Sequence, residues 1–133
     1  MFSVSFDLSI KSPPETVFKA LTEQELLTRW FAPQVIAVPV EGTVAAFAFE
    51  FDLNFKMELV LLNSNSLVHW KCVDGYKEWL HSEVLFKLIP SSKGTKLHFE
   101  HNRLINVEKK QKTTLSWKQY LEKLKKLCET NPL

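Results

Sequence analysis

Apolar and polar residues alternate along most of the first hundred positions of the chain. From Phe2 to Ile10 every second residue is apolar and the residues between are polar or charged, which predicts a β-strand with one buried face. Similar patterns, separated by turn residues, predict six further strands. These are Val35 to Val40, Thr43 to Phe51, Phe55 to Leu62, Leu67 to Val73, Trp79 to Ile89 and Thr95 to Arg103. Pro39 confines the first of these to an edge or a strand end.

Two short helices are predicted between the first strand and the other six. Ser12 is followed by two prolines and Glu15, so Ser12 can act as the N-cap and Glu15 can complete a capping box. The segment Thr22 to Glu25 repeats this capping pattern and predicts a second short helix. Pro33 then ends that helix.

A long helix is predicted at the C-terminal end. Trp117, Leu121, Leu124 and Cys128 recur at helical spacing, with charged residues on the opposite side. The helix is expected to begin between positions 111 and 114 and to end before Asn131. The predicted fold is therefore α+β: a curved antiparallel sheet of about seven strands, in β-α-α-β(6)-α order, wrapped on a long C-terminal helix. We expect one domain over residues 1–133.

Composition excludes several classes of function. The formal net charge of +2 is too small to indicate binding to nucleic acid or to an anionic membrane, although lysines are concentrated from Lys109 to Lys126. No apolar run approaches the roughly 20 residues of a membrane span, and the N-terminus does not resemble a signal peptide. Cys72 and Cys128 match no metal or redox spacing, and the three glycines form no phosphate-binding loop. We therefore predict a cytoplasmic protein without a cofactor.

Polar residues gather at one end of the predicted last hairpin. If paired residue numbers sum to about 185, Phe86 faces Phe99, Val84 faces His101 and Ser82 faces Arg103 on the inner face. These polar groups could orient the polar head of a ligand. Alternatively, His101 is hydrogen-bonded to backbone or water, and Arg103 turns out to solvent.

Two other chemistries are not favoured by the residue pattern. His81, Glu83, His98 and Glu100 have metal-binding side chains, but the same pairing separates the two histidines along the hairpin, so we expect no metal and a solvated outer face. No serine or cysteine has a base at a recognisable spacing. Glu50 is predicted to point outward.

Large aromatic residues come from nearly every predicted element. They either fill the core or line a cavity for an apolar ligand. On the second interpretation, the candidate ligand-binding residues are Trp30, Phe47, Phe49, Trp70, Ser82, Phe86, Phe99, His101, Trp117 and Leu121.

Several motifs resemble a known superfamily. They are Ser12-Pro13-Pro14-Glu15 with Val17-Phe18, Trp30-Phe31 in the second helix, the strand from Gly94 to His101, and Ser116-Trp117 with Leu121 and Leu124. Together they resemble the START-like superfamily, the helix-grip fold of the birch-pollen allergen and the polyketide cyclases. Within it, the sequence is similar to bacterial proteins related to the C-terminal domain of the activator of the Hsp90 ATPase. Ser116 stands where many members have glycine, and the glycine that usually follows the last-strand histidine is missing.

The resemblance implies three possible functions. The leading expectation is a binding module for a small apolar or amphipathic ligand held between the sheet and the last helix. The second is a co-chaperone-like protein that binds a larger partner, which would connect it with the stress response. The third is a cyclase or dehydratase in which His101 acts as acid or base. We expect binding rather than catalysis.

Overall fold

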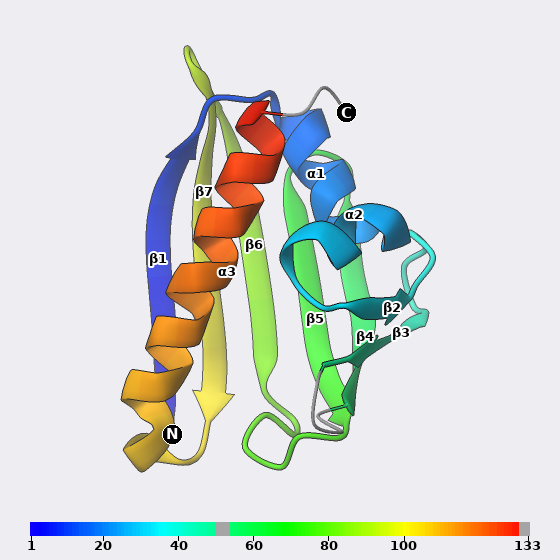
Figure 1. Ribbon diagram of the computed structural model, residues 1–133, viewed down its shortest axis with the longest axis vertical. Helices are drawn as coiled ribbons and strands as arrows, with labels where there is room; N and C mark the ends of the chain where they lie inside the picture. The colour runs from blue at the N-terminus through cyan, green and yellow to red at the C-terminus, as the bar shows by residue number, and fades with distance from the viewer. Residues whose placement is uncertain (50–53, 131–133) are drawn as a thin grey trace.

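Seven antiparallel strands form one curved sheet in the computed structural model, which describes residues 1–49 and 54–130. Their order across the sheet is β1-β7-β6-β5-β4-β3-β2 (Figure 1). The strands are β1 (Phe2–Ile10), β2 (Gln34–Ile36), β3 (Val44–Ala48), β4 (Asn54–Asn63), β5 (Leu67–Asp74), β6 (Glu83–Ser91) and β7 (Gly94–Leu104). The predicted element order and the α+β class are confirmed.

The helices lie on one face of this sheet (Figure 1). The long helix α3 (Lys110–Thr130) follows the short 3-10 helix η1 (Val107–Lys109) and runs diagonally past β1, β7 and β6. Helices α1 (Pro14–Thr22) and α2 (Gln24–Trp30) cover the part of the sheet nearer β5. The apolar side of α3, including Trp117, Leu121 and Leu124, is buried against the sheet, as its spacing predicts.

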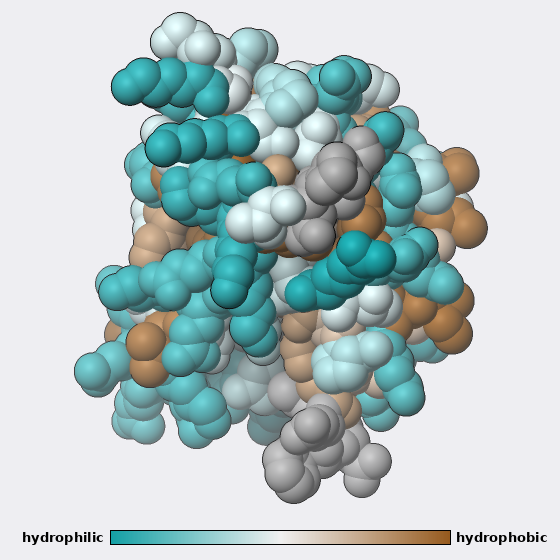
Figure 2. Space-filling view, turned by 45° about the horizontal axis from the view of Figure 1, so that its top comes forward, coloured by the Kyte–Doolittle hydropathy of each residue, from teal (hydrophilic) through white to brown (hydrophobic). Residues whose placement is uncertain are grey.

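Hydrophilic and hydrophobic residues are distributed unevenly over the surface. Figure 2 shows hydrophilic side chains over the side where α3 and β1 lie, with a few hydrophobic residues among them. Hydrophobic residues also gather at the side of β2 and β3, where Ile36, Val38, Val40 and Val44 are each more than half exposed.

The predicted helix caps were wrong. Pro13 is the N-cap of α1 and Glu23 that of α2, and neither helix start has a side-chain cap hydrogen bond. Ser12 is instead held at the end of β1, where its carbonyl accepts a hydrogen bond of 2.7 Å from the Thr95 hydroxyl. The Thr22 hydroxyl donates back to the carbonyl of Phe18 within α1.

Two of the predicted strands are also shorter than expected. The strand expected from Val35 to Val40 is only the three-residue β2. The strand expected to start at Trp79 starts at Glu83, because successive turns occupy the preceding residues and His81 has a φ of 69°. Glu50 and Phe51 lie outside the described residues.

The register of the last hairpin is confirmed from Glu83 to Ser91. Val84 pairs with His101 and Phe86 with Phe99, so the numbers of paired residues sum to 185 as predicted. The expected pairing of Ser82 with Arg103 was wrong, since β6 begins at Glu83, which pairs with Asn102. Arg103 has a φ of 60°, and its exposed side chain forms an ion pair with Glu83, so it does not belong to the inner face.

Candidate ligand site

Aromatic rings from four elements and from Phe49 converge on Phe31, at the C-terminal end of α2. The Phe31 ring lies 5.2 to 6.0 Å, between centroids, from rings on β3, β4, β5 and α3 and from Phe49, just beyond β3. These rings belong to Phe47, Phe49, Phe55, Trp70, Trp117 and Tyr120. Most of the contacts are edge-to-face, the arrangement that the charge distribution of aromatic rings favours.

Most of the predicted site residues belong to this same interior cluster. Phe47, Trp70, Phe86, Phe99, Trp117 and Leu121 are all buried to within 2% of full burial. Trp30 is also buried, and its indole N–H donates to the carbonyl of Ala20 at 2.7 Å. Phe49 is only partly buried and lies at the border of the cluster. The structure thus brings these residues together, and ligand contact by them stays a prediction.

Phe31 is the central residue that the list of candidate site residues omitted. The sequence places Phe31 directly after Trp30 and two residues before Pro33. The end of the helix at this point turns the Phe31 ring into the interior. The proline was therefore a usable signal that these two adjacent aromatic residues need not lie on opposite helix faces.

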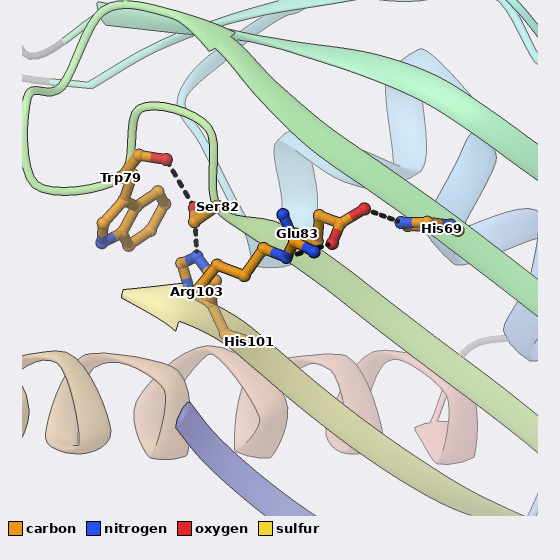
Figure 3. Close-up of polar contacts among 6 residues, drawn as sticks. All are labelled: His69, Trp79, Ser82, Glu83, His101 and Arg103. Carbon is orange, nitrogen blue, oxygen red and sulfur yellow. Dashed lines mark hydrogen bonds and ion pairs between the residues drawn. The ribbon is translucent and has the colours of Figure 1, made fainter. Parts of the chain in front are cut away.

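A hydrogen-bonded chain crosses the buried polar end of the cluster, and Figure 3 shows its part from His101 through Ser82 to Trp79. The indole N–H of Trp117 donates to His101 Nδ1 at 2.9 Å, and His101 Nε2 lies 2.8 Å from the hydroxyl oxygen of Ser82. The Ser82 hydroxyl donates to the carbonyl of Trp79. Because that hydroxyl has one hydrogen, it must accept from Nε2–H of His101.

These contacts fix the protonation state of His101. Its Nδ1 accepts and its Nε2 donates, so the ring is the neutral Nε2–H tautomer. Burial of the imidazole, which disfavours its charged form, lowers the pKa of His101 from 6.5 to about 3. Both ring nitrogens are occupied by protein groups, as the second interpretation of the sequence anticipates, although the partners are side chains rather than backbone or water.

A second polar group lies on the other face of the same strands. Glu83 on β6 contacts Arg103 at 3.2 Å and His69 on β5 at 3.1 Å (Figure 3). Nearby on this face, His98 pairs with Asp7 of β1 at 2.7 Å. The histidines and acids considered as metal ligands therefore take part in ion pairs or lie apart. No cluster of three or more such side chains occurs among residues 1–49 and 54–130.

A cavity of about 220 Å³ adjoins the aromatic cluster beside the N-terminal half of α3. It is lined by Phe49, Phe55, Tyr76, Trp79, Lys112, Thr113, Ser116 and Tyr120. The Trp79 side chain is 6% exposed, and its indole N–H has no hydrogen-bond partner in the described part of the chain. This donor, and the equivalent one of Trp70, carry the cost of a buried unpaired polar group.

The strand order, the crossing helix and the aromatic interior define a helix-grip protein of the START-like superfamily. A family model described as "Activator of Hsp90 ATPase homolog 1-like protein" matches residues 11–129. The chain belongs to this family, which confirms the resemblance seen in the sequence. No protein of curated function matched the sequence. No helix within the described residues has the length and hydropathy to span a membrane.

Solved structures share the fold at low sequence identity. One is the Aha1 dimer from Colwellia psychrerythraea, with 23% identity, a TM-score of 0.88 and 98% of each chain covered. Another is protein MLL2253 from Mesorhizobium loti, with 23% identity, a TM-score of 0.84 and 99% and 100% of the two chains covered. DynU16, a putative protein of the dynemicin biosynthetic locus, has 17% identity and a TM-score of 0.81, and the match covers 96% of this chain and 47% of DynU16.

Proposed function

We propose that this protein binds a small aromatic or hydrophobic molecule carrying a hydrogen-bond acceptor, in the cavity between the N-terminal half of α3 and the sheet. The observation that carries the proposal is the unpartnered indole N–H of Trp79, a residue of the cavity wall. A ligand carbonyl, ether or carboxylate oxygen reaching this donor would remove the cost of leaving it unpaired.

The size of the cavity limits the ligand. An apolar cavity of about 150 Å³ holds a benzene molecule, whereas pockets for drug-sized molecules measure roughly 300–1,000 Å³. At about 220 Å³, this cavity suits a molecule of one or two rings. A longer ligand would have to displace Phe49 or Tyr120, the partly buried rings between the cavity and Phe31.

Polar groups at the rim add a second requirement. Thr113, Ser116 and the exposed Lys112 are among the residues that line the cavity. An anionic group on the ligand would gain from Lys112 while its ring packs against Phe55 and Trp79. Aromatic acids therefore meet both requirements.

The structure favours binding over acid–base catalysis at His101. A general acid or base must exchange its proton with a substrate, and both nitrogens of His101 are engaged with Trp117 and Ser82. The cyclase or dehydratase alternative would need this chain to break. The co-chaperone alternative is supported by family membership and concerns the surface rather than this cavity.

Screening a library of one- and two-ring acids and esters by thermal shift tests the proposal. A compound at one hundred times its dissociation constant adds about 2.7 kcal/mol to the free energy of unfolding, which raises the midpoint by roughly 10 °C for a domain of this size. The S116F variant should fill the cavity and remove the shift. The matched control Q119F, at an exposed position of α3, should keep it.

The indole donor is tested separately with the W79F variant, which keeps an aromatic ring and lacks the N–H. Compounds with an acceptor should lose roughly tenfold in affinity, the value of one hydrogen bond of about 1.4 kcal/mol, while purely apolar compounds should be less affected. If no compound stabilises the wild-type protein, or if S116F leaves all shifts intact, the proposal is wrong.

A further inference from the structure

A groove separates the open edge of β1 from the N-terminal half of α3. Strand β1 is one edge of the sheet, because β7 is its only neighbouring strand within the described part of the chain. The groove measures about 590 Å³ and is bordered by Phe6 on β1, by Val107 in η1, and by Lys110, Leu115 and Lys118 on α3. It lies apart from the cavity assigned to the proposed function and shares no lining residue with it.

The backbone of β1 presents hydrogen-bonding groups toward the open edge of the sheet. The carbonyl of Ser9 accepts a hydrogen bond from Lys125 Nζ of α3 at 2.5 Å, so it points away from β7. Backbone groups alternate in direction along an antiparallel strand. The N–H and C=O groups of Ser5 and Asp7 therefore face the open edge as well, in the part of β1 next to the groove.

Contacts between β1 and α3 close the other end of this edge. Besides the contact of Lys125 with Ser9, the backbone N–H of Lys11 donates to the Glu129 carboxylate at 2.8 Å. The space beside β1 is therefore open near Phe6 and closed near Lys11. An extended segment entering it has room for only a few residues.

Side chains in the groove combine apolar contact with positive charge. Leu115 is 55% exposed and Val107 is 68% exposed, while Phe6 is partly buried beneath them. Two lysines, Lys110 and Lys118, border the groove against one acid, Glu108. Figure 2 shows the same mixture on this side of the molecule, with hydrophobic residues set among hydrophilic ones.

We propose that the groove binds a short extended peptide in which acidic and apolar residues alternate, added as a further strand on β1. Peptides add to sheet edges through main-chain hydrogen bonds, and alternate side chains then enter pockets. Apolar side chains on the groove side of the peptide would pack on Phe6 and Leu115, and acidic side chains at the rim of the groove would pair with the exposed Lys110 and Lys118. A second copy of this chain is disfavoured as the occupant, because its own edge strand β1 carries a single acidic residue, Asp7, and would bring little negative charge to Lys110 and Lys118.

The test uses an acetylated, amidated peptide of sequence EVEFEVEV against isotope-labelled protein in NMR titrations. Amide shifts should concentrate on β1 and on the first three turns of α3, and the amide hydrogens of Ser5 and Asp7 should become protected from exchange. Affinity should fall as salt screens the lysines. A scrambled peptide of the same composition, EEEEVVFV, should bind at least tenfold more weakly.

Three variants locate the interaction, and each is first checked for a native amide spectrum. L115D should weaken binding at least tenfold and K118E roughly fivefold, whereas K123E, on the same helix and not at the groove, should change it less than twofold. S5P removes an edge-facing N–H without removing a bond to β7, and it should abolish protection at Asp7.

Four outcomes would overturn the proposal. The first is equal binding of the scrambled peptide, and the second is a shift pattern centred outside β1 and α3. The third is concentration-dependent dimerisation that L115D abolishes, which would assign the groove to a second copy. The fourth is binding to vesicles with anionic lipid but to no peptide, which would assign it to a membrane surface.

Discussion

Mild acid tests the proton positions assigned to the buried chain from Trp117 through His101 and Ser82 to Trp79. The native protein holds His101 neutral, since Nδ1 must accept from Trp117 and burial opposes a charge. The unfolded chain has an ordinary imidazole with a pKa near 6.5. Between these two pKa values the unfolded state binds one more proton than the native state.

The sign and size of the effect follow from this difference. Because the folded-state pKa of about 3 lies below the unfolded value, stability is fully present above pH 6.5 and is lost as the pH falls toward 3. The slope is about 1.4 kcal/mol per pH unit. From pH 7 to pH 5 the His101 contribution to the free energy of unfolding should therefore fall by about 2 kcal/mol.

Urea denaturation at pH 7 and pH 5 measures the effect, with the H101Q variant as the comparison. Glutamine keeps one donor and one acceptor and does not titrate in this range. The other three histidines and the carboxylates are common to both proteins, so subtracting the variant's pH dependence isolates that of His101. The wild type should lose about 2 kcal/mol more than the variant over this interval.

The nitrogen resonances of the imidazole provide a check that does not depend on any variant. From pH 8 to pH 5 His101 should remain the neutral Nε2–H tautomer. A titration midpoint of His101 near 6.5, or a proton on Nδ1, would refute the assigned chain. Equal losses of stability by the wild type and H101Q on acidification would also refute the assigned chain.

The packing and backbone geometry give further predictions. F31A should lower the free energy of unfolding by about 3–5 kcal/mol, because Phe31 contacts the six rings of the cluster described above. L115A, at an exposed position, should change it by less than about 0.5 kcal/mol. Urea denaturation measures both changes. G94A should lower the free energy of unfolding by several kcal/mol, since its Cβ would lie 2.3 Å from the carbonyl oxygen of Ile10 at a φ of 140°. G42A, with open space at a φ of 87°, should lower it by only about 1–2 kcal/mol. Equal losses in the two variants would contradict the close approach at Gly94. Both cysteine thiols are buried, which raises their pKa values to about 11 and about 12, so neither should react with a thiol reagent at pH 8 until the protein unfolds.

The sequence was sufficient for the sheet and the hairpin because their signals are local. Period-2 patterns and turn residues between them specify strands, and one hairpin turn sets the register for every pair that follows. That is why Val84 and His101 were placed opposite each other correctly. Capping was mispredicted because a tertiary contact decided it: the hydroxyl of Thr95, 83 positions away, holds the backbone of Ser12 at the end of β1.

The polar end of the site was only partly predictable, for a geometric reason. Ser82 and His101 were expected at the same end of the inner face, and the structure brings them within 2.8 Å of each other, a contact that the residue pattern did not predict. Arg103 was misplaced because its positive φ, together with an irregular register between Phe2 and Val4 of β1, changes the direction of the strand there. A non-glycine residue with positive φ is uncommon, and no glycine marks this position in the sequence.

Whether large aromatic residues line a cavity or fill it is a question of ring placement, which residue spacing does not determine. The expected cavity lay between Phe47, Trp70 and Trp117, and the Phe31 ring stands there, stacked on Trp117 at 5.5 Å and 13°. Space remains where this ring does not reach, beside Tyr120 and Trp79. Phe31 thus explains both the packed interior and the position of the small cavity. A smaller side chain at position 31 would extend the cavity toward the residues that the sequence analysis predicted as ligand-binding.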